Sequence, residues 1–498
     1  MTTDILLAAM SLVFAPKVLA IILAASVFGL FVGAIPGLTA TMAAALMVPL
    51  TFFMDPVPAV SAIVAATAMA IFAGDIPGAM LRIPGTPASA AYVEDSYAMT
   101  QRGQLRTVLG LNLICSALGG VFGSIILMVA APALARIAMR FSSDEYFWLA
   151  LLGLSCAVFI AASNPVKGVL SLLVGLSIAM IGFDPSAGYP RFSFGITELT
   201  GGVDFVPAMI GMFAIPEVIR NLVNIHQVQP VQKRVSHVFS GLGERLKQRW
   251  WNILRSSALG TLIGALPGAG ADIAAWVCYA VSKKFSREPE KYGTGHDEGI
   301  IDATASNNAA VSGSWVPALV FGIPGGAVTA IAVGIMYMKG LNPGPRIFAE
   351  SPEIIYAVLI AFLIANLIMV PLGYVAIRMA GLIIGVPRAV LMPIIMIFCM
   401  VGAFAITNSS FAIVIVLIMG LLAYGMEENG IPLAPAILGL VLGPLVERNF
   451  VMSMTKSGGD LLSLFDRPIA AVLGITTLTI WLLPIVMASL RRYRGQQA

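Results

Sequence analysis

Long uninterrupted apolar runs restrict what this chain can fold into more than any other feature of its sequence. A helix of about 20 apolar residues crosses the roughly 30 Å hydrocarbon core of a bilayer, whereas the lipid-facing strands of a barrel alternate apolar and polar residues. The runs here are continuous and lie near residues 18–35, 57–74, 106–131, 146–163, 165–183, 205–222, 251–266, 311–338, 354–385, 387–407, 410–425, 430–446 and 468–490. They predict an all-α polytopic membrane protein with about 12 transmembrane helices.

The scarcity of charge supports the same prediction. Only 11% of the 498 residues are charged, whereas about a quarter of the residues of a soluble domain are charged. A lipid bilayer is therefore the expected surrounding of most of the chain.

The apolar sequence carries a duplicated set of Pro-Gly motifs. The first motif recurs 231 residues later (260 − 29), as the pairs Gly29 and Gly260, Gly33 and Gly264, Pro36 and Pro267, and Gly37 and Gly268. The second recurs 240 residues later (317 − 77), as the pairs Pro77 and Pro317, Ile83 and Ile323, Pro84 and Pro324, and Gly85 and Gly325. We expect two related halves, and an inverted orientation of the halves would provide alternating access.

These motifs and the distribution of charge divide the chain into four parts. We predict a first membrane repeat over residues 1–223, a basic cytoplasmic linker over 224–250, a second membrane repeat over 251–447, and a C-terminal helix with a cytoplasmic tail over 448–498. Basic loops favour the cytoplasmic side. Such runs can also bind nucleic acid or anionic lipid, but topology accounts for them, and no nucleic-acid partner is expected. The basic residues are Lys233, Arg234, Arg245, Lys247 and Arg249 in the linker, and Arg491, Arg492 and Arg494 in the tail.

The Pro-Gly breaks are candidates for a transport site. A broken helix at membrane depth is tolerated where the freed backbone groups face protein or a watery cavity, and interrupted segments at matching positions of two repeats indicate a substrate site. Helix N-termini at such breaks bind anions. The alternative is that each break is a turn and each neighbouring hydroxyl a helix-packing group. The candidates for substrate binding are Pro36, Gly37, Thr39, Thr41, Pro84, Gly85, Thr86, Ser89, Pro267, Gly268, Gly270, Pro324, Gly325 and Gly326, with Thr329 after the last break.

Three polar residues near the breaks occur in one half only. Asn307 and Asn308 could coordinate substrate or a cation through their amides, or hydrogen-bond neighbouring helices. Arg82 could pair with a substrate carboxylate or extend to the membrane interface. Its counterpart in the second half is Gly322, so the charge is not part of the repeated frame.

Asp75 and Asp272 are carboxylates close to the breaks and are candidates for binding a coupling cation. An ionisable residue in a membrane segment is a functional candidate, although Asp272 could also cap a helix N-terminus. In an intramembrane aspartyl protease, two such carboxylates would activate water as acid and base. That alternative does not require duplicated breaks, and the segment from Gly268 to Asp272 lacks the usual Gly-x-Gly-Asp spacing.

Motifs of other chemistries are missing from the sequence. There is no HExxH, GxSxG or Walker pattern, the histidines His226, His237 and His296 lie in polar loops, and the cysteines have no CxxC spacing. We therefore expect no cofactor, no metal site and no enzymatic activity.

With their neighbours, the motifs become more specific. They read Gly33-Ala-Ile-Pro-Gly-Leu-Thr-Ala-Thr-Met, Arg82-Ile-Pro-Gly-Thr-Pro-Ala-Ser-Ala, Gly264-Ala-Leu-Pro-Gly-Ala-Gly-Ala, Ala305-Ser-Asn-Asn-Ala-Ala, Phe321-Gly-Ile-Pro-Gly and Gly340-Leu-Asn-Pro-Gly-Pro. Over nearly the whole chain, this set resembles the large membrane subunit of the tripartite tricarboxylate transporters, the TctA family. At Asp302-Ala-Thr the family often has a Pro-Glu element, so no role of that Glu carries over.

The resemblance implies a transport function and two protein partners. The partners would be a small four-helix membrane subunit, TctB-like, and a periplasmic solute-binding protein, TctC-like. We expect secondary-active uptake of a tricarboxylate, dicarboxylate or aromatic acid across the bacterial inner membrane, as symport with Na⁺ or H⁺. A carboxylate carrier that works alone is the alternative within transport.

Overall fold

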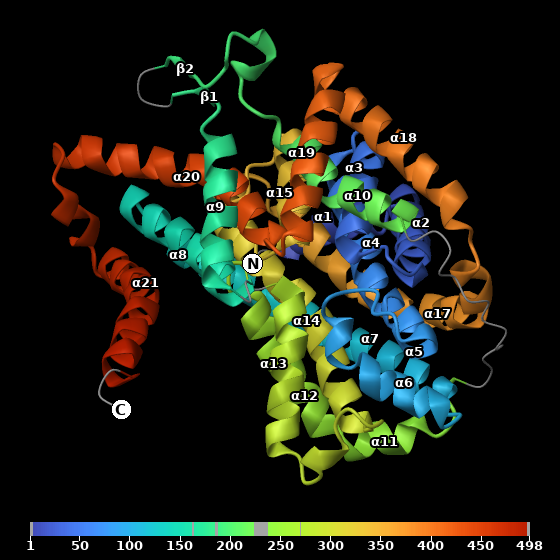
Figure 1. The fold of residues 1–498 in the computed structure, drawn as a ribbon. Helices are drawn as coiled ribbons and strands as arrows, with labels where there is room; N and C mark the ends of the chain where they lie inside the picture. The colour runs from blue at the N-terminus through green and yellow to red at the C-terminus, as the bar shows by residue number, and fades with distance from the viewer. Residues whose placement is uncertain (1–2, 162–163, 185–187, 224–237, 269, 496–498) are drawn as a thin grey trace. The chain divides into compact units, whose positions relative to one another are not determined.

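The described part of the chain is almost entirely helical, as predicted. A computed structural model describes residues 3–161, 164–184, 188–223, 238–268 and 270–495 (Figure 1). The first helices are α1 (Thr3–Val13), α2 (Pro16–Ala34), α3 (Ala40–Thr51), α4 (Pro56–Ala73), α5 (Asp75–Leu81), α6 (Val93–Gln101), α7 (Leu105–Ala138), α8 (Ser143–Ala161), α9 (Pro165–Ala179) and α10 (Phe205–Val223). The later helices are α11 (Leu242–Gln248), α12 (Trp250–Gly264), α13 (Gly270–Phe285), α14 (Asp297–Phe321), α15 (Ala327–Met338), α16 (Ile347–Glu350), α17 (Pro352–Ile384), α18 (Arg388–Thr407), α19 (Phe411–Glu428), α20 (Leu433–Ser457) and α21 (Pro468–Gly495).

Short elements complete the described structure. The 3₁₀ helices are η1 (Ser89–Ala91), η2 (Thr197–Leu199), η3 (Pro289–Lys291) and η4 (Leu461–Phe465). The strands β1 (Gly182–Phe183) and β2 (Pro190–Arg191) pair antiparallel, with Gly182 opposite Arg191.

Eight helices in the described residues are long and apolar enough to cross a bilayer. They are Pro16–Ala34, Pro56–Leu81, Leu105–Ala138, Phe205–Val223, Pro352–Ile384, Ala389–Thr407, Phe411–Glu428 and Leu433–Ser457. Shorter apolar helices include α3, α9 and α15. The chain is therefore a multi-pass membrane protein. The total of about 12 spans and the inverted orientation of the halves stay predictions.

The chain forms two compact units. Unit 1 comprises residues 1–135 and 204–429, and unit 2 comprises residues 136–203 and 430–498. The four parts predicted from the sequence have other boundaries, because they were drawn from the duplicated motifs; that division stays a prediction. Its boundary at residue 447 falls inside α20. Residues 224–237 of the linker, with Lys233 and Arg234, lie outside the described residues, as do the side chains of the tail arginines.

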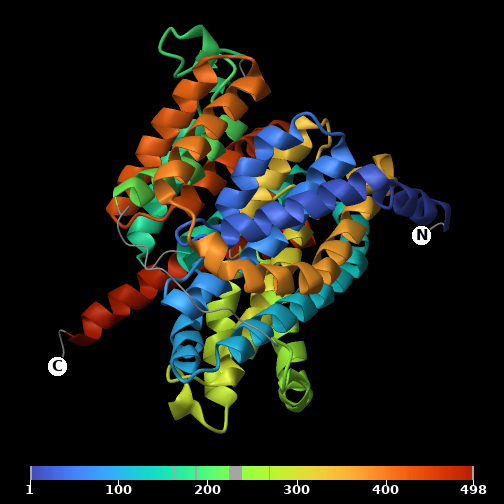
Figure 2. The ribbon, with the colours of Figure 1, turned by 90° about the vertical axis from the view of Figure 1, so that its right-hand side faces the viewer.

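In unit 1, equivalent helix pairs of the two halves pack in the same way. Helix α2 packs on α4, and α12 packs on α14 (Figure 2). A Cβ on Gly33 would lie 2.3 Å from the carbonyl oxygen of Ala70, and a Cβ on Gly264 would lie 2.2 Å from that of Ala310. The glycines are 231 residues apart (264 − 33) and the alanines 240 (310 − 70), which are the offsets of the sequence motifs. Small residues let both helix pairs approach to backbone contact.

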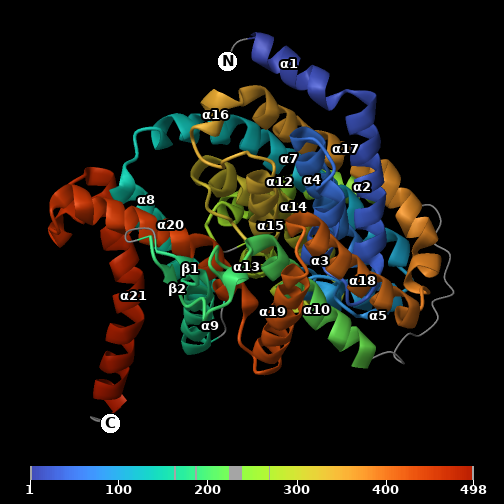
Figure 3. The ribbon, with the colours of Figure 1, turned by 90° about the horizontal axis from the view of Figure 1, so that it is seen from above.

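The two halves exchange packing partners, which means that helices of the first half pack against helices of the second half. Helix α10 packs on α18 and α19 within unit 1, whereas α20 packs on α8 and α9 within unit 2 (Figure 3). Helix α17 packs on α2 and α4, and α7 contacts α12 and α14 through Leu111, Ile253 and Ile301. Each half therefore completes its packing with helices of the other half.

Candidate functional site

Each Pro-Gly break ends one helix and begins the next. At the first break, α2 ends at Ala34 and α3 begins at Ala40; at the third, α12 ends at Gly264 and α13 begins at Gly270. Gly37 and Gly268 turn the chain at equivalent positions with φ of 90° and 80°, a backbone conformation that glycine adopts without strain. Thr39 Oγ1 accepts a hydrogen bond of 3.2 Å from the Met42 N–H and so caps α3.

The second break, at Pro84-Gly85, and the fourth break, at Pro324-Gly325, also repeat one backbone conformation. Arg82 has a φ of 60° and its counterpart Gly322 a φ of 69°, so the arginine occupies a left-handed position that favours glycine. Arg82 is exposed, and it holds the carboxylate of Glu94 through Nε at 3.0 Å and Nη2 at 2.9 Å. The guanidinium predicted to hold a substrate carboxylate thus holds a carboxylate of the protein in a bidentate contact.

The hydroxyl groups after these two breaks form equivalent caps. The Thr86 N–H donates to Ser89 Oγ at 3.1 Å, and the Gly326 N–H donates to Thr329 Oγ1 at 2.9 Å. The Ser89 N–H also donates to Thr86 Oγ1 at 3.1 Å. A ligand that uses these hydroxyls must replace the cap bonds.

Three of the four breaks come together in unit 1. The Gly270 N–H donates to the Gly325 carbonyl at 3.1 Å, which joins the third break to the fourth. Trp276 Nε1 donates to the Pro87 carbonyl at 3.1 Å, which joins α13 to the segment after the second break. We call this meeting of the second, third and fourth breaks the break junction.

Asp272 takes part in the break junction. It lies in the first turn of α13 as an exposed residue, and its carboxylate faces the Ala88 N–H of the segment after the second break. The first break has a different neighbour, since Asn221 Nδ2 of α10 donates to the Gly37 carbonyl at 3.2 Å. The structure therefore places Gly37 and Thr39, with Pro36 and Thr41 beside them, at a boundary with α10.

The two predicted asparagines make different contacts. Asn308 Nδ2 donates to the Ser116 carbonyl of α7 and to Asn366 Oδ1 of α17, both at 3.2 Å. Asn308 therefore links three helices. Asn307 is only 1% exposed, and neither polar atom of its amide has a hydrogen-bond partner among the described residues. Its amide is available to a ligand.

Asp75 is buried close to Asn307. The Tyr92 hydroxyl donates to Asp75 Oδ1 at 2.5 Å, while Asp75 Oδ2 has no hydrogen-bond partner in the described structure. The side chains of Asn307 and Thr304 face the same hydroxyl. Sequence reasoning missed Tyr92 and Thr304. For Thr304 a signal existed, because it lies one helical turn before Asn307 and so shares its helix face.

Asp95, also missed from the sequence, joins the halves outside the apolar helices. Its Oδ1 accepts three backbone N–H bonds, from Gly293 at 2.9 Å, Gly295 at 2.7 Å and His296 at 3.0 Å. Its Oδ2 accepts the Tyr279 hydroxyl at 2.6 Å. The loop after α13 is therefore fixed to α6 of the first half.

Glu298 extends this polar region at the start of α14. Burial alone would raise the pKa of Glu298, but hydrogen bonds from Ser286 and Asn252 and the charge of Arg249 hold it below the ordinary value of 4.5. Arg249 Nη1 lies 3.1 Å from Glu298 Oε1. The described part of the predicted basic linker thus makes specific ion pairs.

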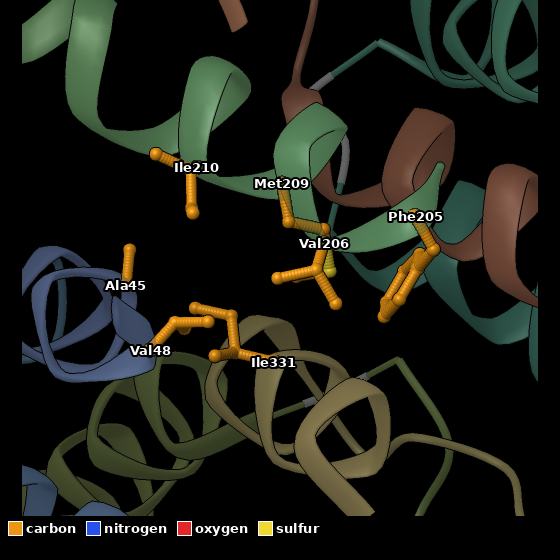
Figure 4. Close-up of a pocket in the computed structure, with 7 residues that line it drawn as sticks. All are labelled: Ala45, Val48, Phe205, Val206, Met209, Ile210 and Ile331. Carbon is orange, nitrogen blue, oxygen red and sulfur yellow. The ribbon is translucent and has the colours of Figure 1, made fainter. Parts of the chain in front are cut away.

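An apolar pocket lies between α3, α10 and α15 of unit 1 (Figure 4). It is lined by Ala45, Val48, Phe205, Val206, Met209, Ile210 and Ile331. These side chains offer no partner to a charged solute, and none belongs to the predicted site. In the described residues, no three His, Cys, Asp or Glu side chains are grouped to hold a metal ion.

The fold defines a class of protein. Apolar helices that are broken at matching positions of a duplicated sequence are typical of membrane transporters. A model of the tripartite tricarboxylate transporter TctA family matches residues 19–438. The chain belongs to this family, and the resemblance found in the sequence is confirmed.

Two relatives come from Agrobacterium vitis. An uncharacterized 52.8 kDa protein in the TAR-I ttuC′ 3′ region is 32% identical over 461 residues, which cover 92% of this chain and 92% of the relative. An uncharacterized protein in the TAR-II ttuC′ 3′ region is 35% identical over 240 residues, which cover 48% of this chain and 98% of the relative. No solved structure matches the chain.

Proposed function

We propose that the protein is the permease subunit of a tripartite transporter, and that it takes up a carboxylate solute across the inner membrane by alternating access. A gradient of Na⁺ or H⁺ drives uptake, and no catalytic step or cofactor takes part. The observation that carries the proposal is the break junction, where segments of both halves meet.

The break junction supplies the groups that a carboxylate needs. Helices α13 and α15 begin there, and a helix N-terminus carries partial positive charge and unpaired N–H groups. Two carboxylates of the protein already lie at donors beside it: Asp272 faces the Ala88 N–H, and Glu94 pairs with Arg82. A substrate carboxylate would replace these internal carboxylates at the same donors.

The exchanged packing supports alternating access. Because α17 packs on helices of the first half and α7 on helices of the second, a shift of one half displaces the helices that it contacts in the other. The break junction lies between segments of both halves, so such a shift changes access to a solute held there.

Two partners complete the proposed transporter. A TctC-like periplasmic solute-binding protein delivers the carboxylate, and a small four-helix TctB-like subunit accompanies the permease in the membrane. Family membership supports both.

Uptake of radiolabelled mono-, di-, tri- and aromatic carboxylates tests the proposal. Cells would produce the permease and the small subunit, with or without the binding protein. We expect saturable uptake of at least one carboxylate that needs the binding protein. No uptake of any of them with both partners present would refute the function, and equal uptake without the binding protein would favour the carrier that works alone.

Substitutions at the breaks test the site. We expect Thr39→Val and Thr86→Val to lower uptake at least about ten-fold while membrane insertion stays normal, because both hydroxyls shape helix starts at breaks. Thr476→Val is the matched control, since Thr476 is exposed and bonds only its own helix, at the Val472 carbonyl. Wild-type uptake by both break variants would refute the site.

A further inference from the structure

A buried polar cluster crosses the boundary between the halves beside the second break. It comprises Asp75 and Tyr92 of the first half and Thr304 and Asn307 of the second, and we call it the Asp75 cluster. All four side chains are at most 2% exposed. Asp75 lies within the candidate span Pro56–Leu81, and in the part of the chain that the structure describes no Lys, Arg or His forms an ion pair with it.

The unpaired atoms of the cluster indicate what is missing. Asp75 Oδ2, Thr304 Oγ1 and Asn307 Oδ1 all lack a hydrogen-bond partner among the described residues. A buried carboxylate without a counter-charge is strongly unfavourable. Asn307 Nδ2 is unpaired as well, and the other three unpaired atoms are oxygens, which are the ligands that hard cations prefer. A single carboxylate compensates a single charge, which favours a monovalent cation.

The other half shows that the fold does not require this cluster. At the positions 240 residues away, Trp315 corresponds to Asp75, Ala332 to Tyr92, Val64 to Thr304 and Thr67 to Asn307. The Thr67 hydroxyl is satisfied by the Ile63 carbonyl at 2.7 Å. Trp315 is buried and its Nε1 also has no hydrogen-bond partner among the described residues. None of the four counterparts leaves a side-chain oxygen unpaired in the described structure, so the unpaired oxygens on one side call for a functional explanation.

We propose that the Asp75 cluster binds one Na⁺, the coupling ion of transport, through Asp75 Oδ2, Thr304 Oγ1 and Asn307 Oδ1. The Tyr92 hydroxyl keeps Asp75 in place by its bond to Oδ1. This inference rests on the proposed transport function, and it assigns Asn307 to the ion.

The position of the cluster explains how the ion acts on the solute site. Asp75 directly follows Gly74, whose carbonyl accepts the Gly85 N–H of the second break at 3.1 Å. An ion held by Asp75 and by two residues of α14 ties this break to the second half. Ion occupancy thereby stabilises the break junction, where the carboxylate is proposed to bind.

Binding of radiolabelled Na⁺ to the purified full-length protein tests the site without transport. At constant pH and ionic strength, we expect saturable binding that unlabelled Na⁺ displaces and choline does not. Asp75→Asn should weaken Na⁺ binding at least ten-fold, and Thr304→Val, which preserves side-chain shape, should weaken it several-fold. Trp315→Phe is the matched control, because Trp315 occupies the Asp75 position of the other half, and this variant should bind Na⁺ like the wild type.

The outcomes separate the ion site from the transport function. Absence of Na⁺ binding by the wild type, or unchanged binding by both Asp75→Asn and Thr304→Val, overturns the Na⁺ site. Uptake driven by a pH gradient alone also overturns it and leaves the proposed function intact. Na⁺ binding that depends on Asp75, in a protein that transports no carboxylate, supports the site and refutes the function. If Asp75→Asn does not fold, the comparison of Na⁺ binding between Thr304→Val and the wild type decides whether the Na⁺ site exists.

Discussion

The close contact between Gly85 and Gly74 leads to a quantitative prediction for Gly85→Ala. A Cβ on Gly85 would lie 2.5 Å from Gly74 Cα and 2.6 Å from the Gly74 carbonyl oxygen. Both obstacles are backbone atoms, so no side-chain rotation relieves the overlap. The second break must move away from the start of α5 by about 0.9 Å to reach ordinary van der Waals contact at 3.4 Å.

The cost follows from two contributions. Overpacking of a close-packed site costs about 1–3 kcal/mol. The same displacement would stretch the bond between the Gly85 N–H and the Gly74 carbonyl from 3.1 Å to beyond hydrogen-bond distance, which costs about 1 kcal/mol more. We therefore expect Gly85→Ala to lower the free energy of unfolding by about 2–4 kcal/mol and to lower carboxylate uptake.

Thermal unfolding in detergent and an uptake assay measure the two effects. Gly325→Ala should behave similarly, because a Cβ there would lie 2.6 Å from the Ser314 carbonyl oxygen. Gly425→Ala is the matched control: no atom lies within 4 Å of its Cβ position inside α19, and the change should stabilise the helix by up to about 1 kcal/mol. Equal unfolding temperatures for Gly85→Ala and Gly425→Ala would refute the close-contact reasoning.

Two further predictions concern the polar region around α6 and the start of α14. Asp95→Ala leaves three backbone N–H groups of the loop after α13 without their acceptor, so limited proteolysis should cut this loop at least about ten-fold faster than in the wild type; unchanged cleavage would show that the carboxylate does not fix the loop. The pKa of Glu298 is held below 4.5, so its contribution to stability is present above that pH and is lost as the pH falls through the lower, folded value. Unfolding temperatures measured from neutral pH downwards should therefore fall more steeply for the wild type than for Glu298→Gln, and parallel curves would contradict this.

Motif spacing predicted the repeated features of the fold. The offsets of 231 and 240 residues follow from glycine and proline positions, and the structure shows equivalent helix contacts, backbone turns and caps at those offsets. Such positions can be recognised in a sequence because close backbone approach and positive φ restrict the residue type almost to glycine. The family resemblance was visible for the same reason.

The contacts across the halves could not be predicted in this way. Nothing in the sequence distinguishes Asn308, which links three helices, from Asn307, which has no hydrogen-bond partner in the described structure. Tyr92 meets Asp75, and Asp95 meets the loop after α13, only because segments far apart in the chain pack together. The sequence pattern shows which residues lie on the same side of a helix, but not which other helix packs against that side.

The exchange of packing partners has a consequence for biosynthesis. Helices α8 and α9 are inserted early in synthesis, yet their partner α20 follows much later; Ser171 of α9 donates to the Pro432 carbonyl, 261 residues further along the chain. Until the ribosome has made α20, the surfaces of α8 and α9 that face it lack their native partner. Contacts over such long sequence separations form slowly, and incompletely packed intermediates expose surfaces that misassemble. Unit 2 therefore cannot complete its assembly before nearly the entire chain has been made.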